Sequence, residues 1–341
     1  QYAHVDYPLQ SHGLAAPWER EDALWYEKIA DRGYALDGTT AFFPLLPLLM
    51  RAVSPFTGGN IPLAGLLVAG VAAAVALALL YRLAEHDTDA ATAGRTVAYL
   101  ALFPTAFFLY AAFTESLFLA VVLGAFWCAR GRHWGAVAGL AALAGLTRVQ
   151  GALLGLPLAV EYLSATGWNR ARLRQRLPVL VLVAGAGALG TLAFFAYVTY
   201  VVHDPYSWSA RETLQWQQQF SWPWDTLGTA LAKAVTPGAE LINQFDLGVL
   251  AVFSGLTVAS FRLRPAYGLL AATVLVSTWF HVRADFPLVS VSRYVLVAFP
   301  CFLVLAIWAG RRRIVHLGIV AFWGIWLLVW SSQVVRGYWV G

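Results

Sequence analysis

Long apolar runs recur along this chain of 341 residues, and they limit its fold more than any other feature. A helix needs about 20 apolar residues to cross the ~30 Å hydrocarbon core of a bilayer. Because 60% of the residues are hydrophobic and only 12% are charged, the chain has apolar length for many crossings. The sequence therefore predicts an all-α, polytopic membrane protein. By apolar length and flanking charge, we place spans at 60–81, 95–111, 115–130, 178–202, 246–262, 265–281, 288–309 and 312–331.

The segment 134–163 does not fit this scheme. It is too long for one ordinary crossing, and the polar stretch 147–151 breaks it. We predict two short helices there that enter the membrane and return, since irregular backbone at that depth needs cover from protein or water. The predicted domains are thus an outer loop with interfacial helices at 1–59 and a transmembrane domain of about ten segments at 60–341. Within the second domain, the tryptophan-rich outer loop 203–245 should also carry short interfacial helices.

Arginine marks one face of the predicted bundle. The basic stretches 82–95, 130–132, 170–176, 262–264 and 311–313 all fall in loops on one side of the spans. The positive-inside rule makes that side cytoplasmic. This placement also accounts for the formal charge of +5 without a nucleic-acid partner. The extracytoplasmic face then receives 1–59, 147–150, 203–245 and 282–287.

Composition narrows the source and the chemistry further. Only two of the 23 basic side chains are lysine, a bias typical of GC-rich prokaryotic genomes, so we expect a prokaryotic plasma membrane. Cys128 and Cys301 both fall in apolar runs and have neither disulfide-type nor metal-type spacing. The motifs of nucleotide hydrolysis, dinucleotide binding, and serine or zinc hydrolysis are absent.

A pair of carboxylates stands beside aromatic residues in the outer segment. Glu21 and Asp22 lie about one helical turn before Trp25 and Tyr26. Near the start of a helix, acids commonly complement the helix dipole and cap free N–H groups. Close to apolar surface, a carboxylate can instead have a raised pKa and serve as a general base. Both interpretations stand on sequence alone, and Asp22 is the first candidate for a catalytic residue.

Charged residues also interrupt apolar sequence at the outer ends of spans. Arg148 in lipid would cost about 2.5 to 3.5 kcal/mol on insertion scales, so it needs a partner. That partner is either Glu115, in a structural salt bridge, or an anionic ligand. Glu115 opens a span, where an acid either reaches to water or serves function. Arginine makes forked hydrogen bonds to phosphate, which suits Arg293 for a lipid-linked phosphate, whereas headgroup anchoring explains Arg283 equally well.

Several short motifs, in the same order along the chain, resemble the PIG-V family of mannosyltransferases. They cover most of the sequence, and their common outer side makes the resemblance more specific than any one of them. The motifs are Arg20-Glu21-Asp22-Ala23, Ile29-Ala30, Gly33-Tyr34, Ala41-Phe42-Phe43-Pro44-Leu45-Leu46-Pro47, Thr114-Glu115-Ser116-Leu117-Phe118, Leu146-Thr147-Arg148-Val149-Gln150-Gly151, and Ser292-Arg293-Tyr294 before Phe299-Pro300.

The PIG-V family belongs to the GT-C glycosyltransferases, multi-span enzymes that take a sugar from a polyprenyl-phosphate carrier on the outer or luminal side. The resemblance implies that a hexose is transferred, with inversion, to a hydroxyl of a lipid or glycolipid acceptor. Mannose is the first candidate for this hexose. It makes Asp22 the catalytic base. Glu21 stands where the family usually has tryptophan, which makes it a candidate second acid. The resemblance also implies a membrane span before Gln1.

For this activity we expect Arg293, Arg148 and Arg283 to bind the donor phosphate. We expect no required cofactor, because the leaving group is already a phosphate on lipid. His203-Asp204 and His281-Asp285 could be assembled into a divalent-metal site, but their spacing does not demand one. A rival hypothesis is a transporter or flippase for a lipid-linked or anionic solute, although no internal repeat is evident. The expected substrate contacts are Glu115, Trp25, Tyr26, Tyr294, Gln150 and Trp216.

Overall fold

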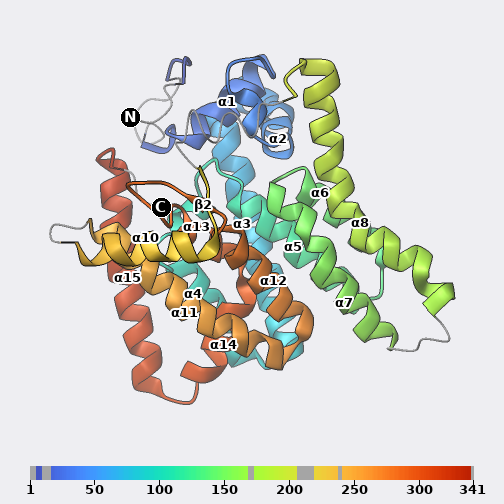
Figure 1. The fold of residues 1–341 in the computed structure, drawn as a ribbon, viewed down its shortest axis with the longest axis vertical. Coiled ribbons are helices and arrows are strands. Elements are labelled where there is room, and N and C mark those ends of the chain that lie inside the picture. The colour runs from blue at the N-terminus through green and yellow to red at the C-terminus, as the bar shows by residue number, and fades with distance from the viewer. Residues whose placement is uncertain (1–4, 10–16, 168–172, 206–218, 237–239, 339–341) are drawn as a thin grey trace.

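The computed structural model describes residues 5–9, 17–167, 173–205, 219–236 and 240–338, and helices make up nearly all of the regular structure there (Figure 1). The α-helices are α1 (Asp22–Arg32), α2 (Leu45–Val53), α3 (Ile61–Asp87), α4 (Ala90–Leu102), α5 (Glu115–Arg130), α6 (Trp134–Gly145), α7 (Gly155–Thr166), α8 (Leu173–Tyr197), α10 (Pro223–Val235), α11 (Leu241–Leu263), α12 (Pro265–Ser277), α13 (Val291–Tyr294), α14 (Phe299–Ala309) and α15 (Arg313–Val335). Short 3-10 or π turns are η2 (Thr39–Ala41), η3 (Ser54–Thr57), η4 (Ala106–Leu109), η5 (Val149–Leu154), η7 (Val198–Val202) and η8 (Val295–Val297), and two short strands are β1 (Gln219–Phe220) and β2 (His281–Val282).

Four of the described helices are long and apolar enough to cross a membrane. They are α3, α11, α15 and the helix Arg174–Val202, which joins α8 to η7. A fifth is added if the bent pair Val291–Val297 and Phe299–Ala309 counts as one span. The polytopic, all-α class predicted from the sequence is therefore confirmed.

Two of the predicted spans are not continuous helices, and both break at a Phe-Pro pair. The span predicted at 95–111 ends as α4 at Leu102, just before Phe103-Pro104. The span predicted at 288–309 is bent by 81° before α14, which begins at Phe299-Pro300. Proline lacks a backbone N–H and disfavours helical geometry in the residue before it, so each helix stops there. The bend matters because it presents the short helix α13 to the space beside α1 and α5.

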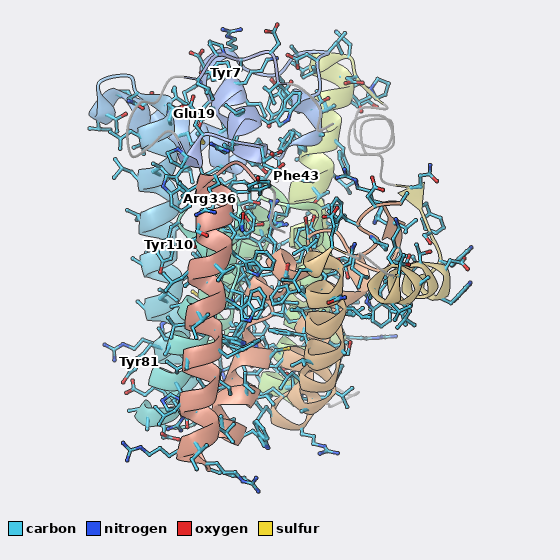
Figure 2. All side chains as sticks on the ribbon, turned by 90° about the vertical axis from the view of Figure 1, so that its left-hand side faces the viewer. Tyr7, Glu19, Phe43, Tyr81, Tyr110 and Arg336 are labelled. Carbon is cyan, nitrogen blue, oxygen red and sulfur yellow. The ribbon has the colours of Figure 1, made fainter. Side chains whose placement is uncertain are left out.

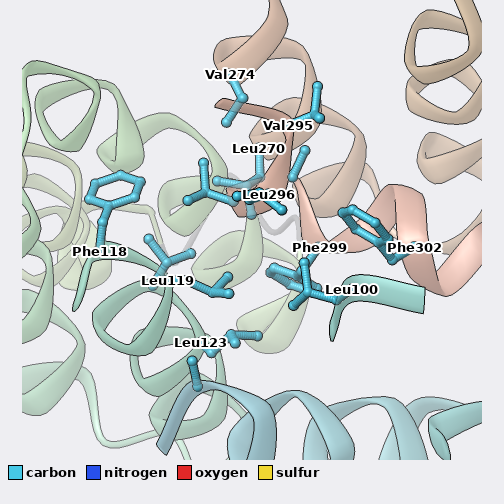
Figure 3. Close-up of a cluster of buried hydrophobic side chains, with 14 of the residues drawn as sticks. Leu100, Phe118, Leu119, Leu123, Leu270, Val274, Val295, Leu296, Phe299 and Phe302 are labelled. Carbon is cyan, nitrogen blue, oxygen red and sulfur yellow. The ribbon is translucent and has the colours of Figure 1, made fainter. Parts of the chain in front are cut away.

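Side chains from four helices meet in a buried core next to that bend (Figure 3). Leu119 and Leu123 come from α5, Leu270 from α12 and Phe302 from α14, and all four are buried. Leu296 of η8, directly after α13, packs into the same core and is fully buried. The core therefore fixes the position of α13 relative to α5.

Backbones rather than side chains meet where α6, η5 and α7 pack on α8. A Cβ added at Gly145 of α6 would lie only 2.9 Å from the amide nitrogen of Thr191 on α8. The Thr191 hydroxyl donates a hydrogen bond to the Gly145 carbonyl at 3.1 Å. On α8, Gly187 faces the carbonyl oxygen of Gly151 with no room for a side chain. Small residues permit this close approach, which is typical of helix packing in membranes.

An ionic network joins four helices at the end of α5 that lies away from Glu115. Asp87 of α3 accepts from Arg130 of α5 at 3.1 Å and from Arg264, before α12, at 3.0 Å. Arg130 also pairs with Glu161 of α7, and the Tyr267 hydroxyl of α12 donates to Asp87 at 2.5 Å. These arginines belong to the loops that the charge pattern assigns to the cytoplasmic face.

The opposite end of the molecule carries the outer segment. Tyr7 and Glu19 lie at this end, far from Tyr81 near the other end (Figure 2). α1 packs on α2 and α3, and β1 pairs antiparallel with β2. α10 packs on α11 and runs across it rather than along it (Figure 1), and it carries exposed Trp224, stacked on Trp222 at 5.3 Å. Its exposed aromatic residues fit the interfacial helix predicted for the loop 203–245.

Candidate functional site

Asp22 is the first residue of α1, and an unusual turn at Glu21 sets its direction. Glu21 has φ 50° and ψ −124°, a backbone conformation that favours glycine. Its side chain makes no capping hydrogen bond, so the cap interpretation does not hold for Glu21. Asp22 instead directs Oδ2 to Nη1 of Arg293, 2.8 Å away.

Arg293 reaches the site from α13, beside the bend. The Thr105 hydroxyl, from the segment after α4, donates to the carbonyl of Ser292 at 2.7 Å and fixes this backbone. The guanidinium of Arg293 lies over the rings of Phe113 and Phe108, at 4.7 and 5.2 Å from their centroids. Such cation–π contacts favour a planar cation in an apolar wall. Because Arg293 is only 5% exposed, protein groups rather than water supply most of its partners.

Glu115 ties Arg293 to the second arginine of the site. It begins α5, is 0% exposed, and accepts from Nε of Arg293 and, at 2.7 Å, from Nη1 of Arg148. Arg148 enters from the extended residue before η5 and lies 4.7 Å from the ring centroid of Tyr294. Removing one member of a buried charge group typically costs about 3–5 kcal/mol. One buried carboxylate thus orders two guanidiniums.

A cavity of about 380 Å³ opens beside these charges. Asp22, Arg148 and Arg293 line it, whereas Glu115 lies behind the arginines. A guanidinium has five N–H donors, and the hydrogen bonds to Glu115 use one on Arg293 and one on Arg148, so donors remain for an anion in the cavity. The other described lining residues are Tyr26, Ala41, Phe42, Phe43, Thr114, Thr147, Val149, Gln150, Ala152, Leu153, Ser277, Thr278, Phe280, His281, Val289 and Tyr294.

The structure brings some of the predicted contact residues to this cavity and keeps others away. Tyr26, Gln150 and Tyr294 line it. Trp25 is buried and stacks on Phe42 at 5.5 Å, so it supports the cavity wall from behind. Trp216 lies outside the residues that the structure describes.

Glu21 and Arg283 are not among the described residues that line the cavity. Glu21 lines a separate cavity of about 30 Å³ together with Phe108, on the far side of the aromatic wall. Burial first, and then the charge of Asp22, raise the pKa of Glu21 to about 7, while Arg283 acts in the opposite direction. The structure thus separates the candidate second acid and one candidate phosphate ligand from the other site residues.

The two residue pairs considered for a metal site, His203-Asp204 and His281-Asp285, do not form one among the described residues. Asp204 accepts from the Thr40 hydroxyl at 2.9 Å. His281 lines the cavity, and burial lowers the pKa of its imidazole, so it is neutral near pH 7. Within the described part of the chain, no three His, Cys, Asp or Glu side chains gather closely enough to hold a metal ion.

Sequence analysis missed the cavity-lining residues at the C-terminal end of α12 and directly after it. Ser277, Thr278 and Phe280 line the cavity, but the predicted span 265–281 had placed them in the membrane. α12 ends at Ser277, and the Thr278 hydroxyl donates back to the carbonyl of Leu275 at 2.7 Å. Adjacent hydroxyl residues at the outer end of an apolar run were the signal available in the sequence.

No family model matches this chain, and no curated protein matches it by sequence. Among solved structures, the chain is similar to ArnT from Cupriavidus metallidurans bound to undecaprenyl phosphate. The TM-score is 0.52, with 18% sequence identity over 84% of this chain and 54% of ArnT. The chain thus spans about half the length of that protein.

At this level of identity the likeness concerns the fold. Because the chain shares the architecture of ArnT, the predicted GT-C-type helical bundle is confirmed at the level of the fold. The narrower PIG-V assignment stays a prediction. Together with the apolar helices, the shared architecture identifies this chain as an integral membrane protein with a GT-C fold.

Proposed function

We propose that this protein is an inverting glycosyltransferase that moves a hexose from a polyprenyl-phosphate donor to a hydroxyl of a lipid or glycolipid on the extracytoplasmic side of a prokaryotic plasma membrane. One observation carries the proposal: in a GT-C fold, the carboxylate of Asp22 and the guanidiniums of Arg148 and Arg293 line one cavity. ArnT, which has a similar fold, binds undecaprenyl phosphate, a lipid phosphate of the class that such a donor would carry.

Each charged group has a role in this reaction. Asp22 accepts the proton of the acceptor hydroxyl as its oxygen attacks the anomeric carbon from the face opposite the phosphate. The bond between that carbon and the phosphate oxygen breaks, and the carrier leaves as polyprenyl phosphate. Arg293 and Arg148 stabilise the charge that develops on the leaving phosphate, and such fixed cations are a large term in catalysis. Glu115 acts through the arginines, as a positioning residue.

The sugar and the acceptor are the finer part of the proposal. We propose mannose because the motifs from Arg20 to Tyr294 resemble those of the PIG-V mannosyltransferases. Tyr26, Gln150 and Tyr294, which line the cavity, are proposed to contact the sugar. The exposed tryptophans near α10 are proposed to hold lipid at the membrane interface.

Purified protein in detergent tests the proposal. It would be given undecaprenyl-phosphate mannose or glucose, radiolabelled in the sugar, with a mixture of lipid acceptors. We expect mannose transfer and a rate at least about 100-fold lower in Asp22→Asn, because a positioned general base contributes about 10²–10⁴-fold. Asp31→Asn, which removes an exposed carboxylate of the same helix, serves as the matched control.

Three outcomes would count against it. Wild-type transfer by Asp22→Asn would remove the base assignment, and transfer of glucose alone would remove mannose. If no lipid-phosphate sugar is consumed while vesicles containing the protein show solute flux, the transporter hypothesis replaces the enzyme.

A further inference from the structure

Arg293 holds two carboxylates in very different surroundings. Its Nε donates to Glu115, which is fully buried at the start of α5. Its Nη1 lies 2.8 Å from Asp22, whose side chain is 21% exposed and lines the cavity. An anion that enters the cavity therefore meets Asp22 but does not meet Glu115.

A phosphate and Asp22 compete for the same part of Arg293. Forked binding of a phosphate uses two neighbouring N–H groups of one guanidinium. Glu115 takes Nε, so the remaining fork is Nη1 with Nη2, and the Asp22 carboxylate lies in an ion pair beside the Nη1 arm of that fork. A phosphate in that fork would also stand close to the Asp22 carboxylate, and like charges at such distances repel.

We infer that Asp22 is a displaceable counter-ion, which a lipid-linked phosphate replaces on Arg293 while Glu115 keeps the arginine in place. Arg148 supports this exchange, because it also donates to Oε1 of Glu115 and so helps to hold that carboxylate in place. The mechanistic consequence rests on the proposed function. Once the donor phosphate has taken its place on Arg293, the Asp22 carboxylate is free to turn to the acceptor hydroxyl and accept its hydrogen bond.

Binding of undecaprenyl phosphate without a sugar tests the exchange independently of transfer. The full chain in detergent would be titrated with this lipid, and with undecaprenol as the chain that lacks the phosphate. Asp22→Asn removes the competing charge but keeps the side-chain shape, so we expect its affinity for undecaprenyl phosphate to rise by roughly five- to ten-fold. Asp31→Asn should change that affinity less than two-fold, and undecaprenol should bind both variants as it binds the wild type.

Unchanged or weaker binding by Asp22→Asn would overturn the inference, as would equal tightening by Asp31→Asn or tightening toward undecaprenol. Thermal melting without lipid checks that each variant folds, and Asp22→Ser is the second variant if Asp22→Asn does not. If Asp22→Asn binds undecaprenyl phosphate more tightly but the wild type transfers sugar from no donor, the exchange is supported and the proposed function is overturned. Transfer that depends on Asp22, with no change in affinity, would do the reverse.

Discussion

The backbone at Glu21 is strained, and this strain separates two adjacent carboxylates. A non-glycine residue held at φ 50° costs on the order of 1–3 kcal/mol. The turn sends Asp22 into the larger cavity and leaves Glu21 in the smaller one, beside Phe108. Burial keeps the pKa of Glu21 at about 7, so this side chain carries less charge next to Asp22 than an ordinary glutamate would. Glu21, which stands where the PIG-V family usually has tryptophan, thus adds less than a full negative charge beside the proposed base near pH 7.

Another acid of α1, Glu27, should make the stability of the outer segment depend on pH. Glu27 is 1% exposed and lies against Glu19, and burial first, then Glu19, raise its pKa to about 9. In the unfolded chain the same carboxyl ionises near pH 4.5. Between these values the folded state binds more protons, so the stabilising contribution is complete below about pH 4.5 and is lost as pH rises through 9.

We expect the apparent melting temperature of the wild type in detergent to fall by several degrees between pH 6 and pH 9. Glu27→Gln, which mimics the neutral acid, should show a smaller fall, to which Glu21 contributes. Glu85→Gln, at a half-exposed acid of α3, is the control and should follow the wild type. An equal fall in Glu27→Gln would show that Glu27 is already ionised in the folded protein.

At the scale of elements, the contact of α8 with η5 holds one side of the candidate site. Gly187 of α8 faces the carbonyl of Gly151, and the Gly151 amide donates to the carbonyl of Arg148 at 2.9 Å. A side chain at Gly187 would push this turn away, and Arg148 would move with it. By contrast, a Cβ at Gly185, on the same helix, meets nothing within 4 Å.

Gly187→Ala should therefore destabilise the protein by about 1–3 kcal/mol, the usual cost of overpacking, and should also slow sugar transfer. Gly185→Ala should leave both properties unchanged or raise stability slightly, because alanine is the better helix former. Melting in detergent and the transfer assay measure the two effects. Loss of equal size in both variants would mean that glycine matters for helix flexibility rather than for the contact with η5.

The sequence predicts elements well where lipid contact alone decides them. α3 and α15 are apolar over a full membrane thickness, so the predicted spans 60–81 and 312–331 match helices in the structure. Prediction from the sequence fails where packing inside the bundle decides the course of a helix. The 81° bend before α14 is tolerated because η8 and α14 are buried in the core, and burial of that kind is invisible in apolar length.

The candidate site shows the same limit. Charge and sidedness assign Asp22, Arg148 and Arg293 to one face, and the structure brings all three to one cavity. Sequence alone does not tell that Glu115 lies behind the arginines rather than in the cavity, since its position depends on how α5 meets α13. Arg283 is also an arginine on the same predicted face, yet it is not among the described residues that line that cavity.

At the scale of the whole molecule, two buried charge clusters lie at opposite ends of α5. Glu115 begins this helix and orders the arginines of the candidate site. Arg130 ends it and joins Asp87, Glu161 and the region of α12. Each cluster joins several helices near one end of the bundle. The distance between the two clusters is therefore set by the helices, such as α5, that contribute to both.

This arrangement predicts that the two ends lie on opposite sides of the membrane, with the network around Arg130 on the cytoplasmic side. Single cysteines would be placed in a Cys128→Ser background, in which the remaining Cys301 is buried. Phe56→Cys, at a side chain that is 88% exposed near the candidate site's end, should react with an impermeant maleimide in intact cells. Ala90→Cys, exposed at the start of α4, should react only after the cells are permeabilised. Equal labelling of both positions in intact cells would reverse or abolish the assignment, and with it the extracytoplasmic location of the proposed reaction.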